Sequence, residues 1–238
     1  AQKIAASKTF DNATSCSSEN SIVIVDAVFD KTIAALEAEG GTLLNPVEKQ
    51  KLQNTLWMQG RLNPDLIAKS AQVIAGAIEL QRPEMNQVKI LMVEETGTGC
   101  EYPFSGEKLC PVLTVYRASN FEAACQQVRK VYDYQGKGHS VGLHSQDESR
   151  PLKMGLSLPA CRVIVNQAHC FATGGNFDNG MPFSLSMGCG TWGDNSVSDN
   201  LNYRHYLNIV RIVRPITPVE PSDEEIFGEF WAKHGRYK

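Results

Sequence analysis

The sequence of 238 residues lacks several features that would assign a chain to a class at once. No apolar stretch approaches the roughly 20 residues that span a bilayer, so the sequence predicts that this is not an integral membrane protein. The formal net charge is −3 and no dense run of Lys and Arg is present. The broad basic surface of a general nucleic-acid-binding protein is therefore missing.

Disulfide and metal-binding patterns are also missing. The chain has seven cysteines, an odd number, and none of them forms a CxxC pair. The five histidines show neither zinc-finger nor HExxH spacing, so the sequence predicts no metal site. Unpaired cysteines and the absence of a signal peptide favour a reduced, cytoplasmic compartment.

Apolar runs alternate with amphipathic stretches along most of the chain. Strands separated by helices imply right-handed crossovers, so the predicted fold is α/β, with a mostly parallel sheet and helices on both faces. Strands are predicted over 21–25, 88–93, 112–116, 141–144 and 162–165, and helices over 28–39, 46–57, 64–78 and 121–131.

The chain changes character after the last of these strands. Residues 168–202 are rich in Gly, Asn, Ser and Asp and show little periodicity, and so long a loop in a compact domain is usually functional or disordered. Interleaved aromatic residues argue against disorder. A β-rich run at 206–213 and a short helix at 223–231 follow. We therefore expect an α/β domain over 1–203 and a strand and tail over 204–238.

Residues 138–142 (GHSVG) match the GxSxG nucleophile elbow of serine hydrolases. That elbow requires a strand before the serine and a helix after it. Here the strand-like run 141–144 follows Ser140, so the context is inverted. A plain connection from helix to strand is the favoured interpretation, with His139 at the edge of the strand, and a serine hydrolase is the minor alternative.

Cys16 lies in a polar segment between the end of a helix and the strand predicted at 21–25. The small hydroxyl and amide residues around it allow partial exposure and hydrogen bonding to a thiolate, which is the reactive form of cysteine. On this chemistry alone, a structural thiol and a catalytic nucleophile are equally good interpretations.

Four segments, in order, resemble motifs of the aldehyde dehydrogenase superfamily. Residues 10–20 (FDNATSCSSEN) resemble the F-D-N-G-T-x-C-x-S-E-Q signature of its CoA-acylating members, although Ala13 stands where the family usually has glycine. The other three are 107–111 (EKLCP), 162–166 (RVIVN) and 186–196 (SMGCGTWGDNS). The resemblance covers nearly the whole chain but only the C-terminal catalytic half of such an enzyme, so the dinucleotide-binding half is expected before Ala1.

This resemblance implies a reaction and a set of site residues. Cys16 is the implied catalytic nucleophile. The implied reaction oxidises a small aldehyde through a thioester on this cysteine, with NAD or NADP as cofactor and coenzyme A as co-substrate. The region after 177 is most similar to members that act on sulfoacetaldehyde. Glu107 is the implied cofactor-binding carboxylate, placed on the nicotinamide-side ribose. The implied substrate pocket consists of Thr14, Ser15, Asn166, His169 and Phe171.

In this superfamily the late β-rich region pairs across a dimer. The resemblance therefore implies that 206–213 mediates a homo-oligomer. Two alternatives remain open: a hydrolytic aldehyde dehydrogenase that releases a free acid, and a catalytically silent fragment that acts as an assembly module.

Overall fold

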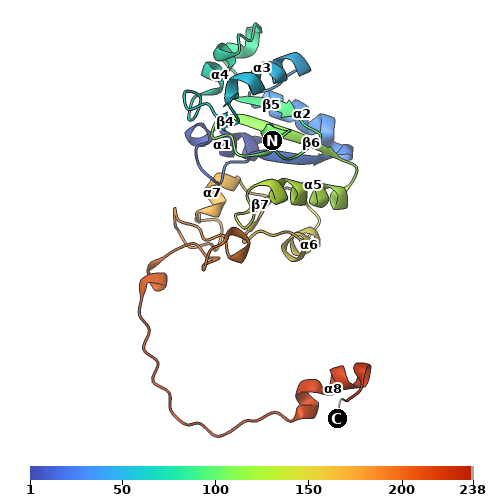
Figure 1. Ribbon diagram of the computed structural model, residues 1–238, viewed down its shortest axis with the longest axis vertical. Helices are drawn as coiled ribbons and strands as arrows, with labels where there is room; N and C mark the ends of the chain where they lie inside the picture. The colour runs from blue at the N-terminus through green and yellow to red at the C-terminus, as the bar shows by residue number, and fades with distance from the viewer. Residues whose placement is uncertain (237–238) are drawn as a thin grey trace. The chain divides into compact units, whose positions relative to one another are not determined.

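The computed structural model describes residues 1–236, which divide into two units, Ala1–His205 and a second unit from Tyr206 onwards (Figure 1). This division lies two residues from the boundary expected at 203/204. None of the helices in the described part of the chain combines the length and apolar character needed to cross a membrane.

The first unit is built on a four-stranded parallel sheet with the strand order β1–β6–β5–β2. Three of the four strands coincide with predicted apolar runs, and the short β2 was not predicted. In the register, Ser21 lies opposite Thr114 and Leu91 lies opposite Val112. The strands are β1 (Ser21–Val25), β2 (Gly41–Leu43), β5 (Ile90–Glu94) and β6 (Val112–Ala118).

Helices cover both faces of this sheet, as predicted, because successive side chains of each strand point to opposite faces. Met92 packs with Leu36 of α2 on one face, whereas Leu91 packs with Leu56 of α3 on the other. The helices are α1 (Gln2–Thr9) and α2 (Phe29–Ala38) on the first face and α3 (Pro46–Leu56) and α4 (Ala71–Ala77) on the second. A hairpin of β3 (Trp57–Met58) and β4 (Arg61–Leu62) follows α3.

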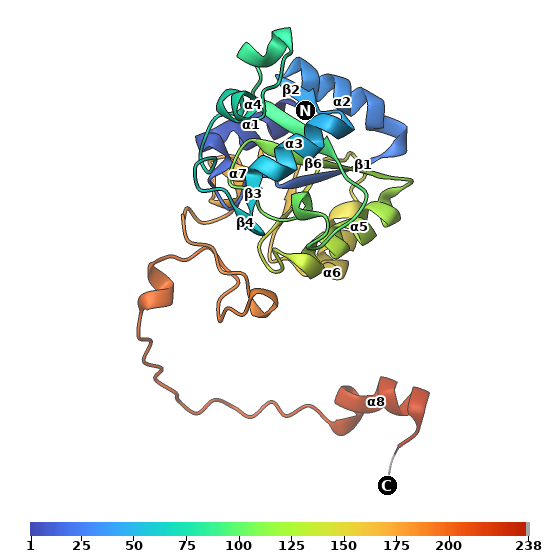
Figure 2. The ribbon, with the colours of Figure 1, turned by 45° about the horizontal axis from the view of Figure 1, so that its top comes forward.

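A second layer lies beside the sheet. Helix α5 packs between the sheet and α6 (Figures 1 and 2), and its apolar residues contact Met154 and Val141. Strands β7 and β8 form a separate parallel pair, so β1 is left as an edge strand of the larger sheet. The elements of this layer are α5 (Phe121–Tyr134), β7 (Val141–Leu143), α6 (Arg150–Ser157) and β8 (Val163–Val165).

The helix predicted over 64–78 is wrong in its first half. Only α4 is helical, and Ser70 caps it, its hydroxyl accepting a backbone N–H of the first turn. Ala68 adopts a left-handed conformation with φ +61°, and its backbone N–H donates to the Leu109 carbonyl at 2.9 Å. A tertiary hydrogen bond to a distant loop thus overrides a local helical periodicity.

The strand expected at 206–213 is not formed in this single chain. The short helix η6 (Tyr203–Tyr206) is followed by residues without regular secondary structure up to α8 (Asp223–His234), the predicted terminal helix. Ile212 is 82% exposed. A strand needs a neighbour for its backbone groups, and no segment among residues 1–236 pairs with this one.

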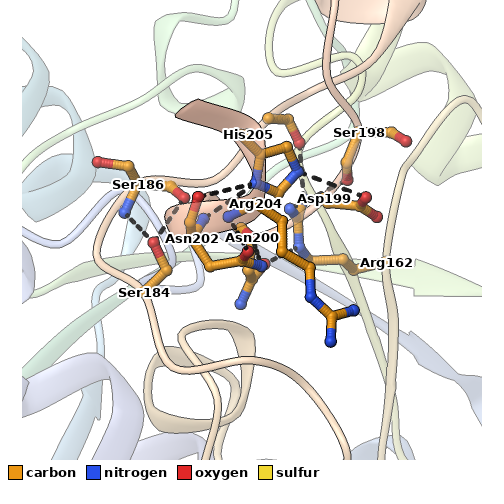
Figure 3. Close-up of polar contacts among 10 residues, drawn as sticks. Arg162, Ser184, Ser186, Ser198, Asp199, Asn200, Asn202, Arg204 and His205 are labelled. Carbon is orange, nitrogen blue, oxygen red and sulfur yellow. Dashed lines mark hydrogen bonds and ion pairs between the residues drawn. The ribbon is translucent and has the colours of Figure 1, made fainter. Parts of the chain in front are cut away.

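The loop predicted at 168–202 begins with α7 (His169–Thr173) and is otherwise largely irregular. A buried guanidinium holds it in place (Figure 3). Arg162 donates from Nε to Asn200 Oδ1 at 2.9 Å and from Nη1 to the Gly188 carbonyl at 2.9 Å and the His139 carbonyl at 3.2 Å. The planar fork of arginine suits several acceptors at once, so one side chain ties this loop to the segment before β7.

Candidate active site

Cys16 is presented on a tight turn between η1 (Phe10–Ala13) and β1, and the residue is exposed. The three residues Asp11–Ala13 all have positive φ, with Ala13 at +61°. This conformation costs an L-residue roughly 1–2 kcal/mol, which is why glycine is expected at this position. Ala13 is only 3% exposed, so surrounding packing holds the strained turn in place.

Two neighbours expected in the substrate pocket stabilise this turn. The Thr14 hydroxyl lies 2.8 Å from the Asp11 carbonyl oxygen and 2.6 Å from an Asp11 carboxylate oxygen. Ser15 Oγ accepts from the Ser17 backbone N–H at 3.3 Å. Their side chains are thus engaged locally, and they set the shape of the loop that carries the thiol.

The Cys16 sulfur is the outer member of a row of polar contacts that leads into the protein. His139 Nε2 lies 3.3 Å from Cys16 Sγ, and His139 Nδ1 lies 2.7 Å from Ser140 Oγ. Ser140 Oγ in turn lies 2.8 Å from His169 Nε2. We call these four residues the thiol network. An imidazole beside an exposed thiol is the arrangement that activates a cysteine nucleophile.

Both imidazoles of the thiol network are neutral at neutral pH. Burial, reinforced by the positive charge of Arg162, lowers the pKa of His139. Burial also lowers the pKa of His169 to about 3, with smaller contributions from His139 and His144. Each ring therefore carries one N–H and one acceptor nitrogen, and which nitrogen holds the proton decides its role.

A cavity of about 510 Å³ opens beside the thiol network. Cys16, His139, Glu107 and His169 line it together with β1, β7 and the apolar side of α5. The Glu107 backbone N–H donates to Gln135 Oε1 at 2.9 Å, whereas its carboxylate makes no hydrogen bond or ion pair within residues 1–236. The cavity is in the size range of small-molecule sites.

The structure therefore brings together Cys16, Glu107 and His169 and places the other expected residues outside the cavity lining. The Asn166 side chain pairs with the Ser145 backbone, accepting from N–H at 2.9 Å and donating to the carbonyl at 2.7 Å. The Phe171 ring packs edge-on against Phe10 with centroids 5.0 Å apart.

Sequence reasoning missed His139 and Ser140 as members of this site. The contact between His139 and Cys16 spans 123 positions, so no local spacing reveals it. One signal was available: each partner lies on a loop that leads into a predicted strand, Cys16 before 21–25 and His139 before 141–144. Amino ends of parallel strands lie at one edge of a sheet, which would have suggested that these loops are neighbours, although the structure places β1 and β7 in separate sheets.

An exposed thiol beside an imidazole, in the lining of a cavity in a parallel α/β fold, is an arrangement typical of cysteine-dependent α/β enzymes. Comparison with known proteins shows which members of this class the chain resembles. No protein-family model matches the chain. The acylating sulfoacetaldehyde dehydrogenase of Cupriavidus necator is 56% identical over 99% of this chain and 48% of its own length. The enzyme of the same name from Bilophila wadsworthia is 39% identical over 99% of this chain and 52% of its own.

A solved structure agrees with these relatives. The acetylating aldehyde dehydrogenase of Geobacillus thermoglucosidasius superposes with a TM-score of 0.85 at 37% identity, over 93% of this chain and 48% of the other. Over nearly its whole length the chain is therefore similar to about half of an acylating aldehyde dehydrogenase, the resemblance that the four sequence motifs predicted. It spans about half the length of the curated relatives it matches.

Proposed function

We propose that this chain supplies the nucleophile of a CoA-acylating aldehyde dehydrogenase. The observation that carries the proposal is the exposed Cys16 thiol, which lies 3.3 Å from His139 Nε2 at a cavity of about 510 Å³, on the loop whose sequence resembles the family's cysteine signature. The identity to acylating relatives over 99% of the chain supports the same assignment.

The residues present account for the covalent steps. The Cys16 thiolate attacks the aldehyde carbon, and the carbonyl electron pair moves to oxygen, which gives a thiohemiacetal anion. The Cys16 backbone N–H has no hydrogen-bond partner within residues 1–236, so it is free to donate to this oxyanion. Loss of hydride then leaves a thioester on Cys16. The thiolate of coenzyme A attacks that thioester, acyl-CoA leaves, and the Cys16 thiolate is regenerated.

The cavity suits the two proposed cofactors, NAD or NADP and coenzyme A. Glu107 lines it with a carboxylate that is free to accept hydrogen bonds from the vicinal hydroxyls of a ribose. The side chains of α5 that face the same space, such as Val128 and Val131, are apolar. When bound, the nicotinamide would accept the hydride. Glu107 would hold the ribose, and Cys16 would hold the substrate.

We propose sulfoacetaldehyde as the aldehyde, because the two relatives named above carry that substrate in their names. Thr14, Ser15, Asn166, His169 and Phe171 remain the predicted pocket residues. His169 would contribute as a neutral ring rather than as a cation for the sulfonate, because burial lowers its pKa to about 3.

The role of Cys16 is tested in the complete enzyme. We expect Cys16→Ala to abolish CoA-dependent formation of NADH or NADPH with sulfoacetaldehyde, because the substitution removes the proposed nucleophile. Cys100 is also exposed and provides a matched control, so Cys100→Ala should keep full activity. Turnover that survives Cys16→Ala would refute the proposal.

Dependence on coenzyme A separates the acylating reaction from a hydrolytic one. We expect no steady turnover without coenzyme A and acyl-CoA as the product, measured with sulfoacetaldehyde, acetaldehyde and succinic semialdehyde in parallel. A rate that is indifferent to coenzyme A, with free acid as product, would favour the hydrolytic alternative. A preference for another aldehyde would correct only the substrate.

We also propose that 206–213 completes a homo-oligomer. The segment has six exposed apolar residues and lacks a partner strand within the described residues, and a second copy of the chain would supply that strand. The seven cysteines are all unpaired, which supports a cytoplasmic location.

A further inference from the structure

The thiol network continues beyond the thiol–imidazole pair and ends inside the protein. His139 is half-buried, and His169, at the inner end, is only 6% exposed. Ser140 lies between the two rings, with its oxygen 2.7 Å from one ring nitrogen and 2.8 Å from the other. A hydroxyl has one proton, so it donates to one ring and accepts from the other.

The inner end determines the direction of these hydrogen bonds. His169 Nδ1 is buried and has no hydrogen-bond partner among the described residues. It lies against Gly142, where a Cβ atom would come within 2.9 Å of Nδ1. A buried N–H without an acceptor is rarer and less tolerated than an acceptor without a donor. The proton of His169 therefore belongs on Nε2, which faces Ser140.

The tautomer of His169 determines the direction of the hydrogen bonds that Ser140 makes. His169 Nε2–H donates to Ser140 Oγ, and the Ser140 hydroxyl then donates to His139 Nδ1. A neutral His139 must carry its own proton on Nε2, the nitrogen 3.3 Å from Cys16 Sγ. Cys16 thus meets a hydrogen-bond donor, which favours the thiolate over the thiol.

We infer that Ser140 and His169 are positioning residues, which fix the tautomer of His139 so that its Nε2–H points at the Cys16 sulfur and stabilises the thiolate. The inference rests on the proposed function only in taking Cys16 as the nucleophile. It also gives the GxSxG-like segment a role: its serine orients an imidazole and does not attack a substrate.

Neutral rings are a condition of this arrangement, and the surroundings meet it. Burial and Arg162 lower the pKa of His139, and burial lowers that of His169. The other charged or titratable groups that face the network or line its cavity are His144, Arg150, Cys125, Tyr132, Cys170, Glu19 and Glu107. None of these groups hydrogen-bonds to a ring nitrogen of His139 or His169 within residues 1–236.

The test is the alkylation of Cys16 by iodoacetamide in the full chain, followed from pH 5 to 10 and resolved by peptide mass spectrometry. We expect Ser140→Ala to slow the alkylation of Cys16 about tenfold at the acidic end of this range, because the thiolate loses its hydrogen-bond donor. Ser140→Thr keeps the hydroxyl and should restore the wild-type profile. Ser149→Ala removes a hydroxyl that donates to Asp147, outside the thiol network, and should leave the Cys16 profile unchanged.

Exposed Cys100 serves as an internal reference, because its profile should be the same in every variant. A Cys16 profile that does not move in Ser140→Ala would overturn the inference. Labelling of Ser140 by a fluorophosphonate would overturn it as well, because it would make the serine a nucleophile. These outcomes leave the proposed function intact as long as Cys16→Ala still abolishes CoA-dependent turnover.

A measurement on the unmodified chain covers the case in which the variants do not fold. Nitrogen-15 NMR of labelled histidines distinguishes protonated from bare ring nitrogens. We expect His139 and His169 both to carry the proton on Nε2 at neutral pH. A proton on Nδ1 of either ring would refute the inference.

Discussion

The two units of this chain differ in how deeply their side chains are buried. In the first unit, residues such as Leu91 and Leu113 are fully buried, and even the guanidinium of Arg162 is only 4% exposed. In the second, Leu207 and Val210 are 56% and 88% exposed. All the non-glycine residues with positive φ among the described residues also lie in the first unit. Dense packing can hold strained or desolvated groups, whereas an unpartnered segment holds neither.

The largest expected effect on the free energy of unfolding comes from replacing a buried arginine of the first unit, and replacing an exposed arginine of the second unit is its control. Arg162→Met leaves the carbonyls of His139, Gly188 and Ser198 without their donor, so the free energy of unfolding should fall by about 3 kcal/mol or more. Arg211→Met in the second unit should change it by less than about 0.5 kcal/mol. Urea unfolding measures both. Equal losses of unfolding free energy in the two variants would contradict the proposed difference in packing between the units.

A second contrast is the response to acid. Because the folded state lowers the pKa of His169 from 6.5 to about 3, the unfolded chain binds more protons between these values, and stability is lost as the pH falls through this window. His169→Gln should flatten the curve of unfolding free energy against pH by roughly 1.4 kcal/mol per pH unit there.

Strain in the cysteine turn predicts a smaller effect. Ala13→Gly removes roughly 1–2 kcal/mol of strain but loses a buried methyl of about 0.8 kcal/mol and loosens the unfolded chain by about 0.4–1 kcal/mol. The net change in unfolding free energy should stay within about 1 kcal/mol. Ala68 has the same φ of +61° but is exposed, so Ala68→Gly should be the more stabilising of the two. A reversed order in thermal unfolding would show that strain is not the governing cost.

The smallest effect on folding is expected in the second unit. Ile212→Asp should change the free energy of unfolding of the first unit by less than about 0.5 kcal/mol, because the side chain is 82% exposed. It should nonetheless lower the molecular mass seen by sedimentation if 206–213 pairs between copies. Thr217→Asp adds the same charge outside that segment and should not. An unchanged mass in Ile212→Asp would contradict the proposed assembly.

Sequence patterns predicted the parts of the molecule that local chemistry decides. The helix predicted over 121–131 is formed as α5, and the Asn120 side chain caps it by accepting the Ala123 N–H at 2.9 Å. The parallel strands follow from apolar runs, and the loop that carries Cys16 coincides with a family motif. The prediction of where α4 begins was wrong because the Ala68 backbone N–H bonds to the carbonyl of Leu109, 41 positions away. His139 was not predicted as a site residue for the same reason, because its partner Cys16 is 123 positions away.

Strand β1 has a consequence for handling the protein. Its five residues are Ser21 followed by four apolar β-formers, and within residues 1–236 only one of its two edges is paired, with β6. An open, apolar edge of this kind is a template on which another polypeptide can add a strand. Preparations of the isolated chain should therefore scatter more light as their concentration rises, and a short peptide that docks on this edge should keep them clear.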